Sequence, residues 1–177
     1  MKIPRDELQA GQPLLPAIFE ANRDLLLEFT DGLNRACRVM LSCISASLDL
    51  PPNKSLNSYH EETESSESGL KFIAEPTLAQ LSDVGDNLHT DGGTFTVVFC
   101  EKPGLQAFFP SLRQWAFIAP TEGCALVNVG NALARFSGGR LHSPQHRVTQ
   151  IEDGAEERFY LSYFLRPSHK ALATLVE

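Results

Sequence analysis

The stretch Asn87-Leu88-His89-Thr90-Asp91-Gly92-Gly93-Thr94-Phe95-Thr96 combines two potential metal ligands with the start of a strand. On an extended segment, residues i and i+2 point to the same side, so the imidazole of His89 and the carboxylate of Asp91 leave one face together. A glycine pair follows, and apolar residues then alternate along 95–99, which is typical of a β-strand. The stretch therefore predicts two ligands at the mouth of a rigid hairpin.

The composition excludes several classes of protein. A chain of 177 residues is long enough for one sizeable core, so we expect one domain with an N-terminal appendage. The hydrophobic share of 42% and charged share of 21% indicate neither a disordered nor a membrane protein. The net charge of -7 disfavours nucleic acid as a partner, because phosphate binding needs a basic face. No run approaches the roughly 20 apolar residues of a membrane-spanning helix.

The start of the chain is charged where a signal peptide would turn apolar, so we expect a cytoplasmic protein. The four cysteines show no C-x-x-C spacing and lie in apolar surroundings. This pattern favours buried, reduced thiols over a zinc site or a disulfide framework.

Two regions of different character precede the strands. From Leu14 to Leu48, apolar residues recur at intervals of three and four, which predicts one long helix or two helices broken near Asp31-Gly32. Pro51-Pro52 ends this region, because proline cannot continue a helix. The run 61–68 then carries four glutamates and three serines, which indicates a solvated loop.

From Leu70 onward the hydrophobic period shortens, and turn residues recur every eight to twelve positions. About eight strands joined by hairpin turns predict a β-sandwich or a jelly roll. The candidate strands are Leu70–Ala74, Asn87–His89, Phe95–Cys100, Leu105–Phe109, Gln114–Ile118, Ala125–Val129, a short piece at Leu133–Phe136, Arg147–Gln150 and Arg158–Leu165.

His146, 55 positions after Asp91, is the candidate for a third ligand. Two histidines and one carboxylate on one face of a metal leave three positions open, which is the geometry of non-haem Fe(II) oxygenases. A structural zinc site would instead be closed by four ligands. Taken alone, a histidine such as His146 is more often an ordinary core or surface residue than a metal ligand.

Arg158 is the candidate for binding an anion next to such a metal. On a strand, Arg158, Tyr160 and Ser162 share one face, and Phe159 lies on the other. A guanidinium followed at i+2 by a hydroxyl can hold a carboxylate through a bidentate ion pair and one further hydrogen bond. Inside a barrel, this pair would bind the distal carboxylate of a 2-oxo diacid whose other end chelates the metal. A surface charge is the alternative for an arginine on a terminal strand.

In the order and spacing of these motifs, the chain resembles the Fe(II)/2-oxoglutarate-dependent dioxygenases of the isopenicillin N synthase-like group, over about residues 70 to 167. The resemblance implies a mainly β fold, a double-stranded β-helix (jelly-roll, cupin-like) core preceded by a long α-helix. It implies Fe(2+) bound by His89, Asp91 and His146. It also implies that Arg158 pairs with the C5 carboxylate of the cosubstrate 2-oxoglutarate, with Tyr160 beside it. The matching stretches are His89–Thr96, Gly104–Gln106, Trp115, Val127–Leu133, Ser137–Arg140, His146–Val148 and Arg158–Tyr160.

The chain departs from the family pattern at three places. Tyr160 stands where the family usually has serine, so the cosubstrate pocket must be reshaped. Glu75-Pro76 stands where a tyrosine-proline usually contacts 2-oxoglutarate, and we expect Glu75 to point away from that anion. Gly130-Asn131 stands where the family usually has glycine-aspartate, a swap that preserves the turn chemistry. Beyond these three places, family members carry a longer N-terminal half, so the chain is expected to be N-terminally short. The predicted division is 1–52 (helical segment), 53–69 (acidic loop), 70–167 (dioxygenase core) and 168–177 (tail).

The expected activity is that of an oxidoreductase. It would use Fe(2+), O2 and 2-oxoglutarate to hydroxylate or desaturate a small organic molecule, with succinate and CO2 as co-products. A truncated homologue that binds metal and ligand without turnover is the alternative. A metal-free jelly-roll interaction domain is a third interpretation, but it gives no reason for this order of ligands. The sequence predicts no particular substrate and no oligomeric state.

Overall fold

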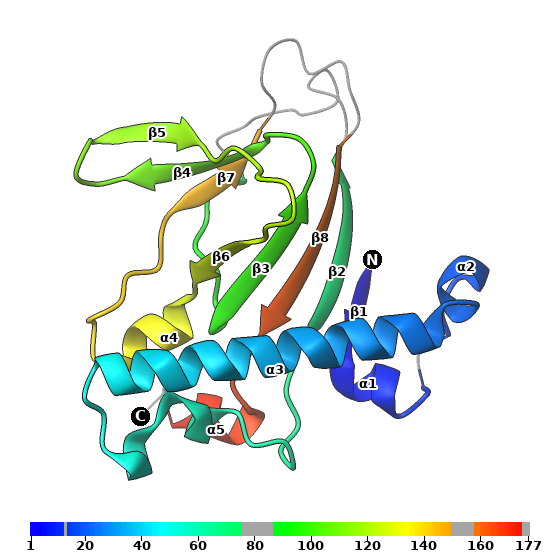
Figure 1. Cartoon of the computed structure of the whole chain (residues 1–177), viewed down its shortest axis with the longest axis horizontal. Coiled ribbons are helices and arrows are strands. Elements are labelled where there is room, and N and C mark those ends of the chain that lie inside the picture. Colours follow the sequence, from blue (N-terminus) through cyan, green and yellow to red (C-terminus); the bar gives the residue numbers. More distant parts are fainter. Residues whose placement is uncertain (13, 76–86, 150–157, 175–177) are drawn as a thin grey trace.

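The computed structural model describes residues 1–12, 14–75, 87–149 and 158–174. Two antiparallel sheets form its core, a five-stranded sheet in the order β1-β2-β8-β3-β6 and a three-stranded sheet in the order β5-β4-β7 (Figure 1). This arrangement is the predicted double-stranded β-helix. The strands are β1 Lys2–Pro4, β2 Gly69–Glu75, β3 Phe95–Cys100, β4 Leu105–Phe109, β5 Gln114–Phe117, β6 Leu126–Val129, β7 His146–Val148 and β8 Arg158–Leu165.

Strand β8 is central to the larger sheet. It pairs with β2 from Gly69↔Phe164 to Glu75↔Arg158, and with β3 from Phe95↔Leu165 to Cys100↔Tyr160. Because side chains alternate along a strand, β8 gives Arg158, Tyr160, Ser162 and Phe164 to one face and the residues between them to the other.

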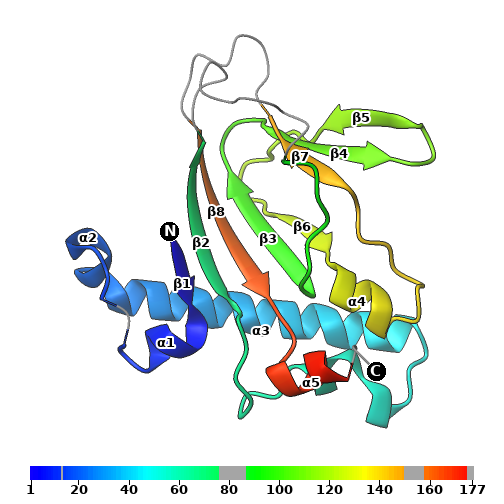
Figure 2. The same ribbon diagram turned by 180° about the vertical axis from the view of Figure 1, so that it is seen from behind.

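Helix α3 (Arg23–Ser47) covers the second of these faces, which is the outer face of the sheet (Figures 1 and 2). Cys37 and Leu41 of α3 are fully buried there, and the Phe29 ring lies 5.5 Å from the ring of Phe99. The helix runs through Asp31-Gly32 without a break, since apolar contacts on both sides of Gly32 stabilise it. The other helices are α1 Arg5–Gln9, α2 Ala17–Glu20, α4 Asn131–Phe136 and α5 His169–Ala173, with 3-10 turns η1 Pro52–Lys54 and η2 Leu56–Tyr59.

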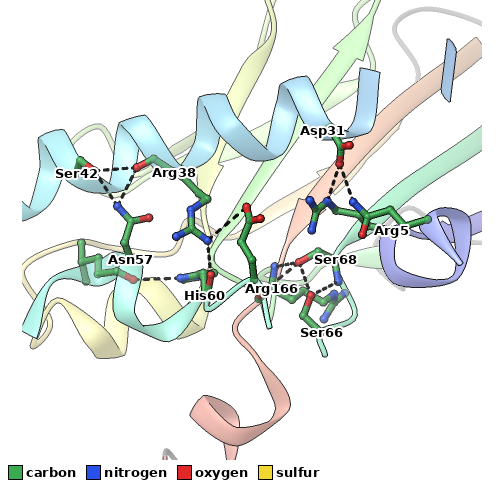
Figure 3. A network of polar contacts seen from close by, with 12 residues as sticks. Arg5, Asp31, Arg38, Ser42, Asn57, His60, Ser66, Ser68 and Arg166 are labelled. Atoms are coloured by element: carbon green, nitrogen blue, oxygen red, sulfur yellow. Dashed lines mark hydrogen bonds and ion pairs between the residues drawn. The ribbon is translucent and has the colours of Figure 1, made fainter. Parts of the chain in front are cut away.

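Polar contacts attach α3 to the segments on either side of it (Figure 3). The Asp31 carboxylate accepts hydrogen bonds from Arg5 and from Gln9, each at 3.0 Å. The segment with the two 3-10 turns, which ends at His60, lies along the same helix. There the guanidinium of Arg38 donates to the carbonyl of His60. The acid-rich run 61–68 is mostly exposed, as expected of a solvated loop, and only Ser68 at its end is buried, where its hydroxyl donates to the carbonyl of Arg166.

The structure corrects three details of the sequence prediction. The strand expected at Leu133–Phe136 is helix α4, because the amides that begin this helix bond to carbonyls of the loop around Asp91. Strand β1 was not expected, since three residues are too few for a periodic signal. Of the four cysteines, only Cys37 is buried, while all four are free thiols. Among the described residues, no helix is long and apolar enough to cross a bilayer.

Candidate metal centre

Three side chains predicted as ligands converge at one end of the two sheets. One ligand atom from each of His89, Asp91 and His146 lies within 4.8 Å of the others. The Oδ1 atom of Asp91 is 3.7 Å from Nε2 of His89 and 3.8 Å from Nε2 of His146. The side chain of His89 is 50% exposed, whereas those of Asp91 and His146 are 10% exposed, so the cluster opens on the side of His89.

Backbone pairing sets the distance between the two histidines. His89 and His146 form an isolated antiparallel bridge, in which each amide donates to the carbonyl of the other residue. The side chain of Asn87 extends this pairing, since its amide donates to the carbonyl of Val148 at 2.7 Å and its oxygen accepts from the amide of Val148 at 2.8 Å. Asn87 thus replaces a missing pair of backbone groups, and the predicted strand at Asn87–His89 is reduced to this bridge.

The second nitrogen of each histidine ring is occupied by a backbone carbonyl. Nδ1 of His89 donates to the carbonyl of Asn87 at 2.6 Å, and Nδ1 of His146 donates to the carbonyl of Pro144 at 3.2 Å. A carbonyl only accepts, so both neutral rings carry their proton on Nδ1. Both Nε2 lone pairs therefore remain for a metal, an arrangement that fixes ring orientation in metal sites.

In Asp91, as in the two histidines, only one of the two polar side-chain atoms is hydrogen-bonded to the protein. Its Oδ2 atom accepts hydrogen bonds from the hydroxyl of Thr96 at 2.6 Å and from the amide of Asn128 at 2.8 Å. Oδ1 is the atom that faces the two histidines. The sequence reasoning missed Thr96 and Asn128, although a single asparagine in the apolar strand β6 was a usable signal.

The loop that carries Asp91 rests on the start of α4 and on a buried histidine. Asn131 donates its amide to the carbonyl of Asp91 at 2.7 Å, and Gly130 donates to the carbonyl of Thr94 at 2.9 Å. From the other side, Nε2 of His60 lies 2.8 Å from the hydroxyl of Thr94. Burial lowers the pKa of His60 to about 4, so the ring is neutral and accepts this hydrogen bond.

Arg158 and Tyr160 lie further along the inner face of β8. The Nε and Nη1 atoms of Arg158 are buried and have no hydrogen-bond partner within the described part of the chain. Unpaired guanidinium nitrogens are costly unless an anion binds them, so this group fits a bound carboxylate. Both residues line a cavity of about 1410 Å³, which contains none of the three clustered ligands. The backbone of Glu75 pairs with Arg158, but the Glu75 side chain lies outside the described part.

The sequence model of the 2OG-Fe(II) oxygenase superfamily matches residues 55–167. The chain belongs to this superfamily. The 2-oxoglutarate-dependent dioxygenase frbH of Dothideomycetidae sp. (strain 11243) is 35% identical over 179 aligned positions, which cover 99% of this chain and 56% of the relative. The 2-oxoglutarate-dependent dioxygenase FG08081 of Gibberella zeae is 35% identical over 170 positions, 95% of this chain and 51% of the relative. The chain thus spans about half the length of these relatives.

Solved structures with the same fold include proteins that were crystallised with the cosubstrate of this superfamily. A full-length Neurospora crassa protein in complex with alpha-KG superimposes with a TM-score of 0.77 at 24% identity, covering 96% of this chain and 55% of the Neurospora chain. JOX2 in complex with 2OG, Fe and JA gives a TM-score of 0.71 at 22% identity, covering 88% of this chain and 44% of JOX2. At these identities the likeness concerns the fold.

The cofactors of the superfamily are Fe(2+), 2-oxoglutarate and O2, and the residues present here fit them. Two imidazole nitrogens and one carboxylate oxygen suit Fe(II) and leave positions for other ligands. The buried Nε and Nη1 atoms of Arg158, which have no partner among the described residues, suit a carboxylate.

Proposed function

We propose that the chain binds Fe(2+) through His89, Asp91 and His146, and that it is the iron-binding part of a 2-oxoglutarate-dependent oxygenase that hydroxylates or desaturates a small organic molecule. The observation that carries the proposal is the division of atoms within the triad. In each ligand, one atom is bonded to the protein and the other points to a shared position. If the histidines were ordinary core or surface residues, there would be no reason for Nε2 of His89, Nε2 of His146 and Oδ1 of Asp91 to face one position.

Each of the protein's own groups has a limited task in this proposal. When bound, iron and 2-oxoglutarate supply the activation of O2. The triad fixes the metal, and the guanidinium of Arg158 pairs with the distal carboxylate of the acid. Tyr160 lies beside that carboxylate. The two sheets bury Asp91 and His146, which keeps water from that side of the reacting groups and strengthens their electrostatic interactions. The small-molecule substrate enters from the side on which His89 is exposed.

Anaerobic titration tests the proposal in two stages. Fe(II) is added to the chain, followed by 2-oxoglutarate, and the metal-to-ligand charge-transfer band is recorded. O2 is then admitted, and succinate is measured with candidate substrates present and absent. We expect the band and then succinate. A correctly folded chain that gives no band would refute the cosubstrate assignment. A band without succinate for any substrate would instead support the binding module without turnover.

A further inference from the structure

The inner faces of β3 and β6 carry a row of residue pairs that begins at the metal centre. Thr96 and Asn128 are opposite each other in the register, and both hold Oδ2 of Asp91. Because side chains alternate along a strand, Val98 and Leu126 are the next pair on this face. The row therefore continues from the metal centre toward the end of β3.

Cys100 and Cys124 follow as the next pair of the row. On the outer face, Phe99 and Ala125 continue the same register, and both pack against the core beneath α3. One further step along the two chains sets Cys124 opposite Cys100. Both thiols then lie on the inner face, since each is separated from the preceding inner pair by one outward-facing residue.

The spacing of opposite residues suits a disulfide. Directly opposed residues of an antiparallel pair have Cα atoms about 4.5 to 5.5 Å apart. A disulfide requires a Cα separation of about 4.4 to 6.8 Å. The two thiols also share one open space, because both line the cavity of about 1410 Å³ that Arg158 and Tyr160 line. Cys100 and Cys124 thus meet the main geometric condition, and no other side chain has to be removed to join them.

The two thiols differ in their access to solvent. Cys124 is exposed, whereas Cys100 is half-buried, and burial raises the pKa of the Cys100 thiol. The thiolate is the reactive form in thiol–disulfide exchange, so a reagent meets Cys124 first. Of the remaining cysteines, Cys37 is fully buried and Cys43 is exposed on α3. Neither belongs to the row on the inner face.

We propose that Cys100 and Cys124 form a site of reversible oxidation, at which a disulfide joins β3 to the segment before β6. The oxidant is a small-molecule disulfide such as oxidised glutathione. The Cys124 thiolate attacks one sulfur of this reagent and releases the first small thiol. The Cys100 thiol then gives up its proton and attacks Sγ of Cys124, which releases the second. Two protein thiols are oxidised, and one reagent disulfide is reduced to two thiols.

This disulfide connects the two strands that orient the metal-facing carboxylate. Thr96 lies on β3 and Asn128 on β6, and the new bond closes the same pair of strands at its far end. The site contains no group that binds iron or an acid in the proposed function. The inference therefore goes beyond that function and is tested without either ligand.

Peptide mapping tests the pairing. The folded chain, kept free of O2, is incubated with oxidised glutathione, the remaining thiols are alkylated, and the protein is cut with trypsin without reduction. Cleavage after lysine and arginine gives peptides 72–113 and 114–135, each of which contains a single cysteine. We expect these two peptides to be joined, and dithiothreitol should separate them. The proposal is wrong if Cys100 and Cys124 are both alkylated, or if each carries its own glutathione.

Serine variants separate the pair from the other thiols. Cys43→Ser removes the exposed thiol of α3 and is the matched control, which should form the cross-link at the wild-type rate. Cys124→Ser should slow the loss of the Cys100 thiol at least about ten-fold, because a half-buried thiol with a raised pKa holds little thiolate. Equal rates of loss in the two variants would show that Cys100 reacts without Cys124, and would overturn the pairing.

Urea unfolding tests the register. A disulfide that fits the native sheet constrains the unfolded chain, so the oxidised protein should unfold at a higher urea concentration than the reduced protein. Cys100→Ser, treated with the same reagent, should show no such increase. An unchanged or lower midpoint in the oxidised wild-type chain would mean that the bond forms only by distorting the sheet. Cys124 would then not be opposite Cys100.

Discussion

His89 and His146 exchange two backbone hydrogen bonds, with N···O distances of 3.0 and 2.9 Å, although 57 positions separate them in the sequence. The imidazoles that face Asp91 are therefore spaced by main-chain pairing, which does not depend on a metal. A side chain on this scaffold can be replaced without moving its neighbours. Single substitutions should accordingly separate the tasks of the individual groups.

His146→Ala and Arg158→Ala should separate metal binding from acid binding. Loss of one of three ligands should abolish iron retention on gel filtration, whereas Arg158→Ala should retain iron and weaken 2-oxoglutarate binding by about ten-fold or more, as expected for a lost charge-assisted bond. His142→Ala removes an exposed histidine four residues from His146 and is the control. Equal loss of iron and acid in both variants would contradict this assignment of roles.

Asn128→Ala should lower metal affinity without removing a ligand. Its amide is one of two groups that hold Oδ2 of Asp91, and loss of such a partner typically costs about 10- to 100-fold in metal affinity. Competition with a chromophoric chelator measures the change. Val127→Ala, at the neighbouring position on the opposite face of β6, should bind metal normally. An unchanged affinity in Asn128→Ala would show that Thr96 alone orients the carboxylate.

Gly130→Ala should destabilise the fold strongly. A Cβ atom at Gly130 would lie 2.1 Å from the carbonyl oxygen of Gly93, and a backbone atom cannot move aside as a flexible side chain can. We expect a loss of about 3 kcal/mol or more in the free energy of unfolding. At Gly92, the same addition meets no atom within 4 Å, so Gly92→Ala is the control. Urea unfolding of both variants tests the contrast, and similar stabilities would disprove it.

Acid should weaken the fold through His60. Its pKa is about 4 in the folded chain, against an ordinary value of 6.5, because burial disfavours the charged ring. Between these values the unfolded chain binds a proton that the folded chain does not, so stability present above pH 6.5 is lost as the pH falls toward 4. One pKa unit corresponds to about 1.4 kcal/mol, so the loss between pH 7 and pH 5 is roughly 2 kcal/mol.

Urea unfolding of the metal-free chain at pH 7 and pH 5 measures this loss. The comparison variant His60→Gln has no group that titrates in this range at that position, so it should lose less stability over the same interval. The carboxylates and the other histidines contribute equally to the loss of stability in both proteins, so their effect cancels in the difference. Parallel losses in the two proteins would remove His60 as the cause.

The sequence predicted the longer elements that have a recognisable hydrophobic pattern. Strands at Phe95–Cys100, Leu105–Phe109 and Arg158–Leu165 have the predicted bounds, and α3 falls within the predicted helical region. Family membership also followed from the motif order. The division of the chain at 52, 69 and 167 and the cytoplasmic location stay predictions, as do the roles of the site residues.

The contacts that support the candidate site join segments distant in the sequence, and hydrophobic periodicity does not predict such contacts. Asn87 meets Val148, His60 meets Thr94, and Gly104 meets Tyr160 only after both sheets have formed. The segment 133–136 is a further example. Its apolar pattern is compatible with a strand, but it is helical because the amides of Asn131 and Ala132 bond to carbonyls of the loop at Asp91.

The two hydrogen bonds to Oδ2 of Asp91 also limit how the carboxylate can move. A carboxylate that pivots can change from one metal–oxygen bond to two, and so compensate for a departing ligand. Thr96 and Asn128 prevent that pivot by holding the second oxygen at 2.6 and 2.8 Å. The three clustered side chains would thus offer a metal three donor atoms and no fourth, so that, as far as the described residues go, each remaining bond would come from a bound molecule.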